Sequence, residues 1–302
     1  MTTARPERSR LPLAAALLTV LLWASAFVAI RHLGPRLSPG PLALGRLVVG
    51  SVVLGAVTAT RRWVPPTRSQ WARVVVCGLL WFGGYNVALN AAERRVDAGT
   101  ASMLVNIGPI LIAVLAGALL GEGFPRRLLG GSLVAFAGVV LIGTAVSSGG
   151  ADVVGVLLCL GAAVGYAVAV VLQKPLLATL PALQVTAMAC AVGTAACLPF
   201  AAQLGRELTR LPAADVGWVA FLGAFPTAVA FTTWAYALAR TSAGRLGATT
   251  YLVPPVAIAL GAALLGEVPP ALAVAGGVLC LGGVALSRRR PRQVVMAAPS
   301  KS

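Results

Sequence analysis

A chain of this composition cannot be an ordinary soluble domain. Of its 302 residues, 58% are hydrophobic and only 11% are charged, whereas a soluble protein has about 25% charged residues to cover its surface. The net charge of +16 comes from Lys and Arg in short clusters between apolar runs. That pattern is typical of membrane-protein loops rather than of a nucleic-acid-binding face. We therefore expect an all-α integral membrane protein, surrounded by the lipid bilayer, that binds no nucleic acid.

The first apolar run is long enough to be an uncleaved membrane span. It covers residues 11–30, about 30 Å at 1.5 Å per residue, which matches the hydrocarbon core of a bilayer. The basic segment 1–10 precedes it, and Ala24-Ser25-Ala26 resembles a signal-peptide cleavage site. Because the apolar run continues past that site, a first transmembrane helix is the preferred interpretation.

Nine further apolar runs follow, each bounded by charge, Pro or Gly. The ten predicted spans are 11–30, 42–60, 71–91, 99–120, 128–146, 154–173, 182–202, 216–238, 244–265 and 270–287. They form a first unit at 11–146 and a second unit at 154–287, with a basic tail at 288–302. Lys and Arg divide seventeen to six between the two sets of loops. The positive-inside rule then predicts a plasma-membrane protein with both termini, segment 1–10 and the tail, in the cytoplasm.

An internal repeat at an offset of 145 residues relates the two units. The segment Ala118–Glu122 recurs without change as Ala263–Glu267. Ten further identities keep the same offset: Arg95, Ala98, Gly99, Pro109, Leu115, Pro125, Gly131, Gly138, Val139 and Leu141 match Arg240, Ala243, Gly244, Pro254, Leu260, Pro270, Gly276, Gly283, Val284 and Leu286. Because each unit has five helices, an odd number, the second unit is expected to lie inverted relative to the first, as in many secondary transporters.

These features resemble the EamA family of the drug/metabolite transporter superfamily. The resemblance rests on two five-helix repeats, on Trp23 and Phe27 in the first span, on Arg46 in the second, and on a Gly-Glu pair that closes the fourth and ninth spans. It covers roughly residues 11–287. It implies a ten-helix transporter of small molecules, without fixing the substrate. The chain departs from a symmetric pattern at Ala191, where the second unit would repeat Arg46.

Polar and aromatic residues inside the spans are the candidate substrate contacts, because a polar group in a bilayer is costly and tends to face a cavity or a partner helix. Alternatively, the amides and hydroxyls hold helices together, and the Trp residues lie at the membrane interface. An arginine in a span either attracts an anionic group of the substrate or snorkels to the interface. The candidates are Trp23, Arg46, Tyr85, Asn86, Asn106, Tyr166, Trp234 and Tyr251.

Four residues at repeat-related positions are candidates for coupling or gating. Glu122 and Glu267 end the fourth and ninth spans. Since no span holds an Asp, Glu or His, any proton dependence is expected to pass through these two carboxylates. Pro109 and Pro254 occupy matching positions, and each Pro frees a backbone carbonyl one turn back.

The inventory of reactive side chains argues against an enzyme. The only histidine, His32, lies in a predicted loop, the eight Asp and Glu lie at span ends or in loops, and the five Cys lie in apolar runs. No catalytic triad, metal site or cofactor is therefore expected. The predicted function is export of a small amino-acid-like or amphipathic solute by alternating access. Import, multidrug efflux and a non-transporting membrane subunit are the alternatives, and whether the protein forms a homodimer is left open.

Overall fold

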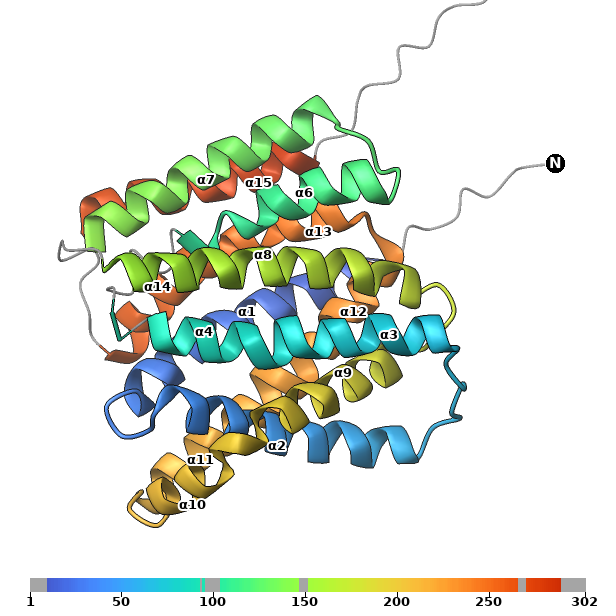
Figure 1. Cartoon of the computed structure of the whole chain (residues 1–302). Helices are drawn as coiled ribbons and strands as arrows, with labels where there is room; N and C mark the ends of the chain where they lie inside the picture. The colour runs from blue at the N-terminus through green and yellow to red at the C-terminus, as the bar shows by residue number, and fades with distance from the viewer. Residues whose placement is uncertain (1–9, 93, 96–103, 147–151, 266–269, 289–302) are drawn as a thin grey trace, which may run out of the picture.

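The computed structural model describes residues 10–92, 94–95, 104–146, 152–265 and 270–288, and in these ranges all regular secondary structure is helical. The first unit contains α1 (Leu11–Leu33), α2 (Pro39–Ala59), α3 (Arg68–Cys77), η1 (Gly78–Gly84), α4 (Tyr85–Ala92), α6 (Gly108–Leu119) and α7 (Arg126–Val146). The second unit contains α8 (Val153–Leu176), α9 (Ala182–Cys197), η2 (Leu198–Phe200), α10 (Ala201–Leu208), α11 (Ala213–Leu222), η3 (Gly223–Val229), α12 (Ala230–Arg240), α13 (Ala243–Thr249), η4 (Thr250–Leu252), α14 (Val253–Leu265) and α15 (Ala271–Arg288). They lie side by side as a bundle (Figure 1).

Seven helical stretches in the described ranges are long and apolar enough to cross a membrane. They are Leu11–Ile30, Pro39–Ala59, Arg68–Ala92, Arg126–Ala145, Val153–Leu176, Ala182–Leu208 and Ala213–Arg240, and each corresponds to one predicted span. The helices in the other three predicted spans are shorter or interrupted. The fourth span is represented by α6, the ninth is divided into α13, η4 and α14, and the tenth is α15. The start of the fourth span lies outside the described residues.

The structure corrects the placement of His32. The first helix continues to Leu33, three residues past the predicted end, so His32 lies in its last turn rather than in a loop. The eighth span also begins earlier than predicted, at Ala213, and this places Asp215 in the first turn of α11, where it is buried.

The two units repeat the same helices at the offset of the sequence motif. The starts of α6 and α14 lie 145 positions apart, and so do the starts of α7 and α15. The two π-helical segments, η1 and η3, both begin and end 145 positions apart. Because π-helices are rare, two of them at matching positions show that the backbone repeats as well as the sequence.

Each π-helical segment is stabilised by a side chain that bonds to its freed carbonyls. In η3 the Thr227 hydroxyl donates to the Leu222 carbonyl over 2.8 Å. Around η1 the Asn86 amide donates to the carbonyls of Trp81 and Phe82 over 3.3 and 2.7 Å. Without these donors, the wide turns would leave carbonyls without a partner in an apolar interior. The polar residues of these helices therefore have a structural role in addition to any role toward a ligand.

Helices α7 and α15 lie side by side along one edge of the bundle (Figure 1) and pack backbone to backbone through glycines. A Cβ atom added to Gly138 would lie 2.5 Å from the Gly276 carbonyl oxygen. One added to Gly283 would lie 2.4 Å from the Ala135 nitrogen and 2.6 Å from the Gly131 oxygen. Small residues allow such close approach between membrane helices.

This packing predicts opposite effects for two adjacent glycines. Gly283→Ala should destabilise the protein by about 1–3 kcal/mol, because the new methyl group would overpack a backbone contact. Gly282→Ala should be neutral or stabilise by up to about 1 kcal/mol, since a Cβ there meets nothing within 4 Å and Ala is the better helix former. Thermal unfolding in detergent would measure both. Equal midpoints for the two variants would contradict the packing described here.

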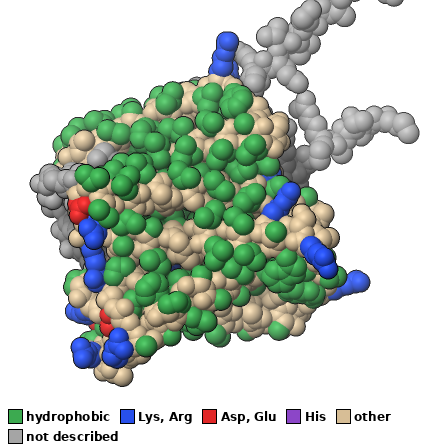
Figure 2. Space-filling view, viewed as in Figure 1, with side chains coloured by type: hydrophobic (Ala, Val, Ile, Leu, Met, Phe, Trp, Pro, Cys, Tyr) green, Lys and Arg blue, Asp and Glu red, His purple; other side chains and the backbone are tan. Residues whose placement is uncertain are grey.

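The outer surface is apolar across the middle of the bundle. In Figure 2, hydrophobic side chains cover the centre of the visible face, and Lys and Arg gather toward its ends. Large hydrophobic side chains that are mostly exposed to the surroundings include Val52, Leu119, Val153, Leu157 and Val278. An apolar band of this kind fits contact with lipid tails, with basic groups near the headgroups.

Candidate functional site

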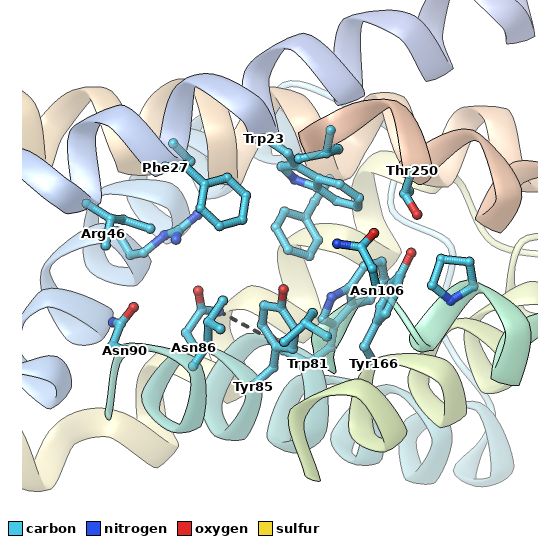
Figure 3. A pocket seen from close by; sticks show the side chains of 17 residues that line it. Trp23, Phe27, Arg46, Trp81, Tyr85, Asn86, Asn90, Asn106, Tyr166 and Thr250 are labelled. Atoms are coloured by element: carbon cyan, nitrogen blue, oxygen red, sulfur yellow. Dashed lines mark hydrogen bonds between the residues drawn. The ribbon is translucent and has the colours of Figure 1, made fainter. Parts of the chain in front are cut away.

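A cavity lies between the two units, in the half of the bundle where α1 and α4 end and α2 begins. Its space, including the open mouth, is about 780 Å³. It is shown in Figure 3, and its walls are formed by Trp23, Ala26, Phe27, Ile30, Arg46, Trp81, Tyr85, Asn86, Leu89, Asn90, Val105, Asn106, Pro109, Tyr166, Phe231, Thr250 and Val253. We refer to this half as the Arg46 end.

Arg46 is the charged group of the cavity. It lies two turns into α2 and is only 6% exposed, so it does not snorkel to the interface. Its Nε donates to the hydroxyl of Thr227 over 3.0 Å. Among the described residues no carboxylate oxygen lies within 4 Å of the guanidinium; the described ion pairs are His32–Asp215, Arg36–Asp215 and Arg95–Asp152. Within the described residues, the cavity therefore contains a buried cation that bonds to a neutral hydroxyl and to no carboxylate.

Amide groups lie near Arg46 on the wall formed by α4 (Figure 3). Asn86 uses its nitrogen on the π-helical carbonyls, which leaves its amide oxygen for other partners. Asn90 donates to the Pro39 carbonyl over 3.1 Å and so joins the end of α4 to the start of α2. Asn106 lies at the other side of the cavity in the same view. Asn86 and Asn90 thus place amide oxygens, which are hydrogen-bond acceptors, on the Arg46 side of the cavity, and Asn106 places one on the other side.

The remaining wall is aromatic and centres on Trp81. Its ring centroid lies 6.0 Å from that of Trp23, 5.1 Å from that of Tyr166 and 4.8 Å from that of Phe231. The hydroxyl of Tyr166 is buried beside the side chain of Thr250 and makes no hydrogen bond of good geometry to the described residues. A buried hydroxyl whose hydrogen bonding is incomplete is costly, so this group is a candidate donor or acceptor for a ligand.

The structure brings together most of the predicted substrate contacts. Six of the eight line the cavity: Trp23, Arg46, Tyr85, Asn86, Asn106 and Tyr166, and Pro109 joins them. The other two do not line it. Trp234 packs behind Trp23 with ring centroids 5.2 Å apart. Tyr251 is fully buried in a separate cluster with Ala113, Ile142 and Cys280. Pro254 is absent from the cavity walls, and Glu267 lies outside the described residues.

The predicted set omitted several cavity residues, chiefly Phe27, Trp81 and Phe231. The 145-residue offset of the repeat could have identified some of the omitted cavity residues. Adding 145 to Asn86 gives Phe231, and both line the cavity. The same step relates Val105 to Thr250, which also both line it. In each pair one unit has a polar residue and the other an apolar residue at the same repeat position, so a search limited to polar residues could not find the apolar member.

The two units also meet at the opposite end of the bundle, through Glu122. Its two carboxylate oxygens accept hydrogen bonds from the backbone nitrogens of Ala243 and Gly244, over 2.7 and 3.1 Å. These are the first residues of α13, whose N-terminal donors have no helical partner. Glu122 lies between Gly121 and Gly123, both at φ 67°, a conformation that favours glycine. We refer to this half as the Glu122 end.

Lys174 binds the turn between α12 and α13 from its other side, at the end of α12. Its ammonium donates to the carbonyls of Leu238 and Thr241 at the end of α12, where helical carbonyls lack partners. Glu122 from the first unit and Lys174 from the second therefore bind opposite polar ends of the α12–α13 turn. Both charges match the helix dipoles that they contact.

Comparison with known proteins finds one family model matching the chain twice. The model of the EamA-like transporter family matches residues 10–144 and again residues 153–289. A probable terminal-alkyne amino-acid exporter of Streptantibioticus cattleyicolor is 38% identical over 277 residues, covering 91% of this chain and 93% of that protein. A probable amino-acid metabolite efflux pump of Salmonella typhimurium is 26% identical, covering 89% of this chain and 92% of that protein.

A solved crystal structure shares the fold. It superimposes with a TM-score of 0.77 and covers 93% of this chain and 97% of the other, at 22% sequence identity. At that identity the likeness concerns the fold alone. The family match, by contrast, spans nearly the whole chain and fits a multi-pass helical bundle with repeated halves. The chain is therefore a member of the EamA-like transporter family, a membrane transporter rather than an enzyme.

Proposed function

We propose that the protein exports a small amino-acid-like solute that carries a carboxylate, an ammonium group and an apolar side chain. Arg46 carries this proposal. A buried cation without an anionic partner is unfavourable, and a substrate carboxylate would supply the missing charge. Nε is already bonded to Thr227, so the two terminal nitrogens of the guanidinium are placed for a bidentate contact with a carboxylate.

The rest of the cavity suits the other parts of such a solute. The amide oxygens of Asn86 and Asn106 are acceptors for an ammonium group. Trp23, Trp81 and Phe231 offer ring faces to an apolar side chain, and aromatic faces also attract an ammonium. The buried hydroxyl of Tyr166 could form a further hydrogen bond to a solute in the cavity. A bare ion would use few of these groups.

Names of relatives support the same class of substrate. The protein of Streptantibioticus cattleyicolor is named as a probable exporter of terminal-alkyne amino acids, and that of Salmonella typhimurium as a probable amino-acid metabolite efflux pump. A terminal alkyne is short, apolar and rigid, so it fits an aromatic wall. We therefore choose propargylglycine, an α-amino acid with a terminal alkyne, as the test solute.

Transport in this proposal follows alternating access between two inverted units. The contact between Glu122 and the start of α13 holds the Glu122 end closed, while the cavity lies nearer the Arg46 end. Basic loops support a plasma-membrane location with cytoplasmic termini, which puts the Glu122 end at the cytoplasm. Rocking of one unit against the other would break the contact at Glu122 and expose the cavity to that side. The same rocking motion is proposed to involve three further gating residues: Glu267, which is the repeat-related partner of Glu122, and the matching pair Pro109 and Pro254.

The test is exchange of labelled propargylglycine by the purified protein in liposomes. Liposomes that contain unlabelled propargylglycine should take up the label much faster than protein-free liposomes. Propargylglycine amide, which lacks the carboxylate, should exchange slowly, because it cannot pair with Arg46. Equal exchange of the amide would contradict carboxylate recognition, and preference for apolar cationic drugs would indicate multidrug efflux. Faster loss of preloaded solute from cells that overproduce the protein would establish export, and faster accumulation would establish import.

A further inference from the structure

A buried carboxylate and the only histidine of the chain meet at the Arg46 end, outside the cavity. His32 Nε2 lies 2.7 Å from Asp215 Oδ1, at the junction of α1 and α11. The Asp215 side chain is 5% exposed, whereas that of His32 is 41% exposed. The pair therefore joins a carboxylate inside the protein to an imidazole that solvent can reach. It also joins the first unit to the second.

Arg36 and Asp215 compete for a hydrogen bond with the same nitrogen, His32 Nε2. Its Nη1 lies 3.1 Å from the same His32 Nε2 and 3.2 Å from Asp215 Oδ2. The oxygen of Asp215 needs a hydrogen on Nε2, while the N–H of Arg36 needs a lone pair there, and one nitrogen cannot supply both. With a hydrogen on Nε2, His32 can donate to Asp215 but cannot accept from Arg36; in the tautomer without that hydrogen, it can accept from Arg36 but cannot donate to Asp215.

Both helices of the pair also line the cavity. Two residues before His32, α1 places Ile30 in the cavity wall. The continuous helical stretch Ala213–Arg240, which has Asp215 in its first turn, runs through η3, where Thr227 binds Arg46, to Phe231 in the same wall. A change in the bond between His32 and Asp215 thus acts on two walls of the cavity, one from each unit.

Two other charged groups that the structure describes at this end bind other partners. Glu207 of α10 accepts from the backbone nitrogen and hydroxyl of Ser38, over 2.8 and 2.6 Å. Arg94, after α4, donates to the Leu37 carbonyl over 3.2 Å. The ring of Trp218 lies 5.7 Å from that of His32 and is neutral. Among the described groups in contact with His32, only Asp215 and Arg36 are charged.

We propose that His32 and Asp215 form the proton-binding site that couples transport to the proton gradient. The proposal rests on the transport function argued above. A proton from the solvent at the Arg46 end binds the pair as Nε2–H donating to the Asp215 carboxylate. The charge-assisted bond strengthens the contact between α1 and α11, and release of the proton weakens it. Proton binding then shifts the balance between the two conformations by its difference in affinity for them.

The experiment imposes a pH gradient without a solute gradient. Liposomes contain the purified protein and labelled propargylglycine at equal concentration on both sides, and the lumen is made about one pH unit more acidic. Exit of one proton per solute molecule would concentrate the label inside by up to about tenfold, because about 1.4 kcal/mol corresponds to a factor of ten. His32→Gln keeps an N–H donor for Asp215 but cannot titrate. It should keep exchange of the labelled solute and lose this accumulation.

Two further variants complete the test. Asp215→Asn should behave as His32→Gln does, because an amide cannot hold the charge. Asp152→Asn alters the exposed ion pair with Arg95, 3.1 Å long, and should accumulate as the wild type does. Accumulation that survives His32→Gln would overturn the proposal, and so would a wild type that exchanges solute but never accumulates it. A wild type that fails to exchange would instead contradict the proposed function.

Discussion

Arg46→Gln should lower the exchange of propargylglycine by about 10- to 100-fold, which corresponds to loss of a charged hydrogen bond worth about 1.5–3 kcal/mol. The variant should fold normally, since it removes a buried cation that has only Thr227 as a described partner. Glutamine keeps hydrogen-bond donors but loses the charge and the planar fork. Initial rates at several solute concentrations, together with thermal unfolding in detergent, measure the two effects separately.

The amide of propargylglycine provides the decisive control for Arg46. If the guanidinium binds the carboxylate, Arg46→Gln should slow the amino acid and leave the slow exchange of its amide nearly unchanged. Arg46→Lys, which keeps the charge without the fork, should fall between the wild type and the glutamine variant. Arg240→Gln alters an arginine at the other end of the bundle, where it lies 3.7 Å from the centre of the Tyr236 ring, and should exchange normally. An equal loss for the amino acid and its amide would show that Arg46 supports the fold instead of binding the carboxylate.

The helices could be predicted because the bilayer imposes a simple rule. A span needs about twenty apolar residues, so the apolar runs gave the helices and most ends to within a few residues. The repeat was equally accessible, since Pro, Gly and Glu at one offset are unlikely coincidences. The π-helical segments η1 and η3 were not predicted. Nothing in local composition separates an i→i+5 turn from an α-helical turn, and the donors that stabilise it, Asn86 and Thr227, look like ordinary polar residues.

The site was predicted in part. The sequence indicates how deep in the membrane a residue lies, but not whether its side chain points into the cavity or toward another helix. Asn106 and Tyr251 occupy matching repeat positions and matching places before a proline. One lines the cavity, whereas the other is fully buried against α7 and α15. The two units therefore use one backbone position differently, as they do at Arg46 and Ala191. Trp81 was missed because an aromatic residue in an apolar run gives no polar signal.

The position of His32 shows how a small error at a boundary changes a functional conclusion. With the first span ending at residue 30, the histidine was assigned to a loop and removed from the list of proton carriers. Helix α1 in fact ends at Leu33, and α11 begins before Asp215. These two shifts of a few residues bring the imidazole and the carboxylate to the same junction. Helix ends are the least certain part of any prediction from sequence, and charged pairs at the ends of spans depend on them.

Glu122→Ala should raise the population of the conformation that is open at the Glu122 end by about fivefold. The carboxylate satisfies two backbone donors of α13, and loss of a helix N-cap costs about 1 kcal/mol. Ile112 of α6 is a suitable probe of this contact. Its side chain is fully buried against α13, where a Cβ added to Gly247 would lie 3.3 Å from it. With Ile112→Cys in place, labelling by a thiol reagent should rise about fivefold in Glu122→Ala above the background of the five buried natural cysteines.

Two matched variants decide whether Glu122 acts as a latch between the units. Glu122→Gln keeps one oxygen acceptor and should give an intermediate rise in labelling at position 112. Glu207→Ala removes a carboxylate that makes the same kind of bonds, to Ser38, at the other end of the bundle. Glu207→Ala should leave the labelling at position 112 unchanged, because loss of the Glu207 carboxylate loosens the Arg46 end, where the cavity already lies. Equal labelling in the wild type and Glu122→Ala would show that α13 is held by packing against α6 alone. A similar rise in Glu207→Ala would indicate general loosening of the bundle, which also contradicts a latch at Glu122.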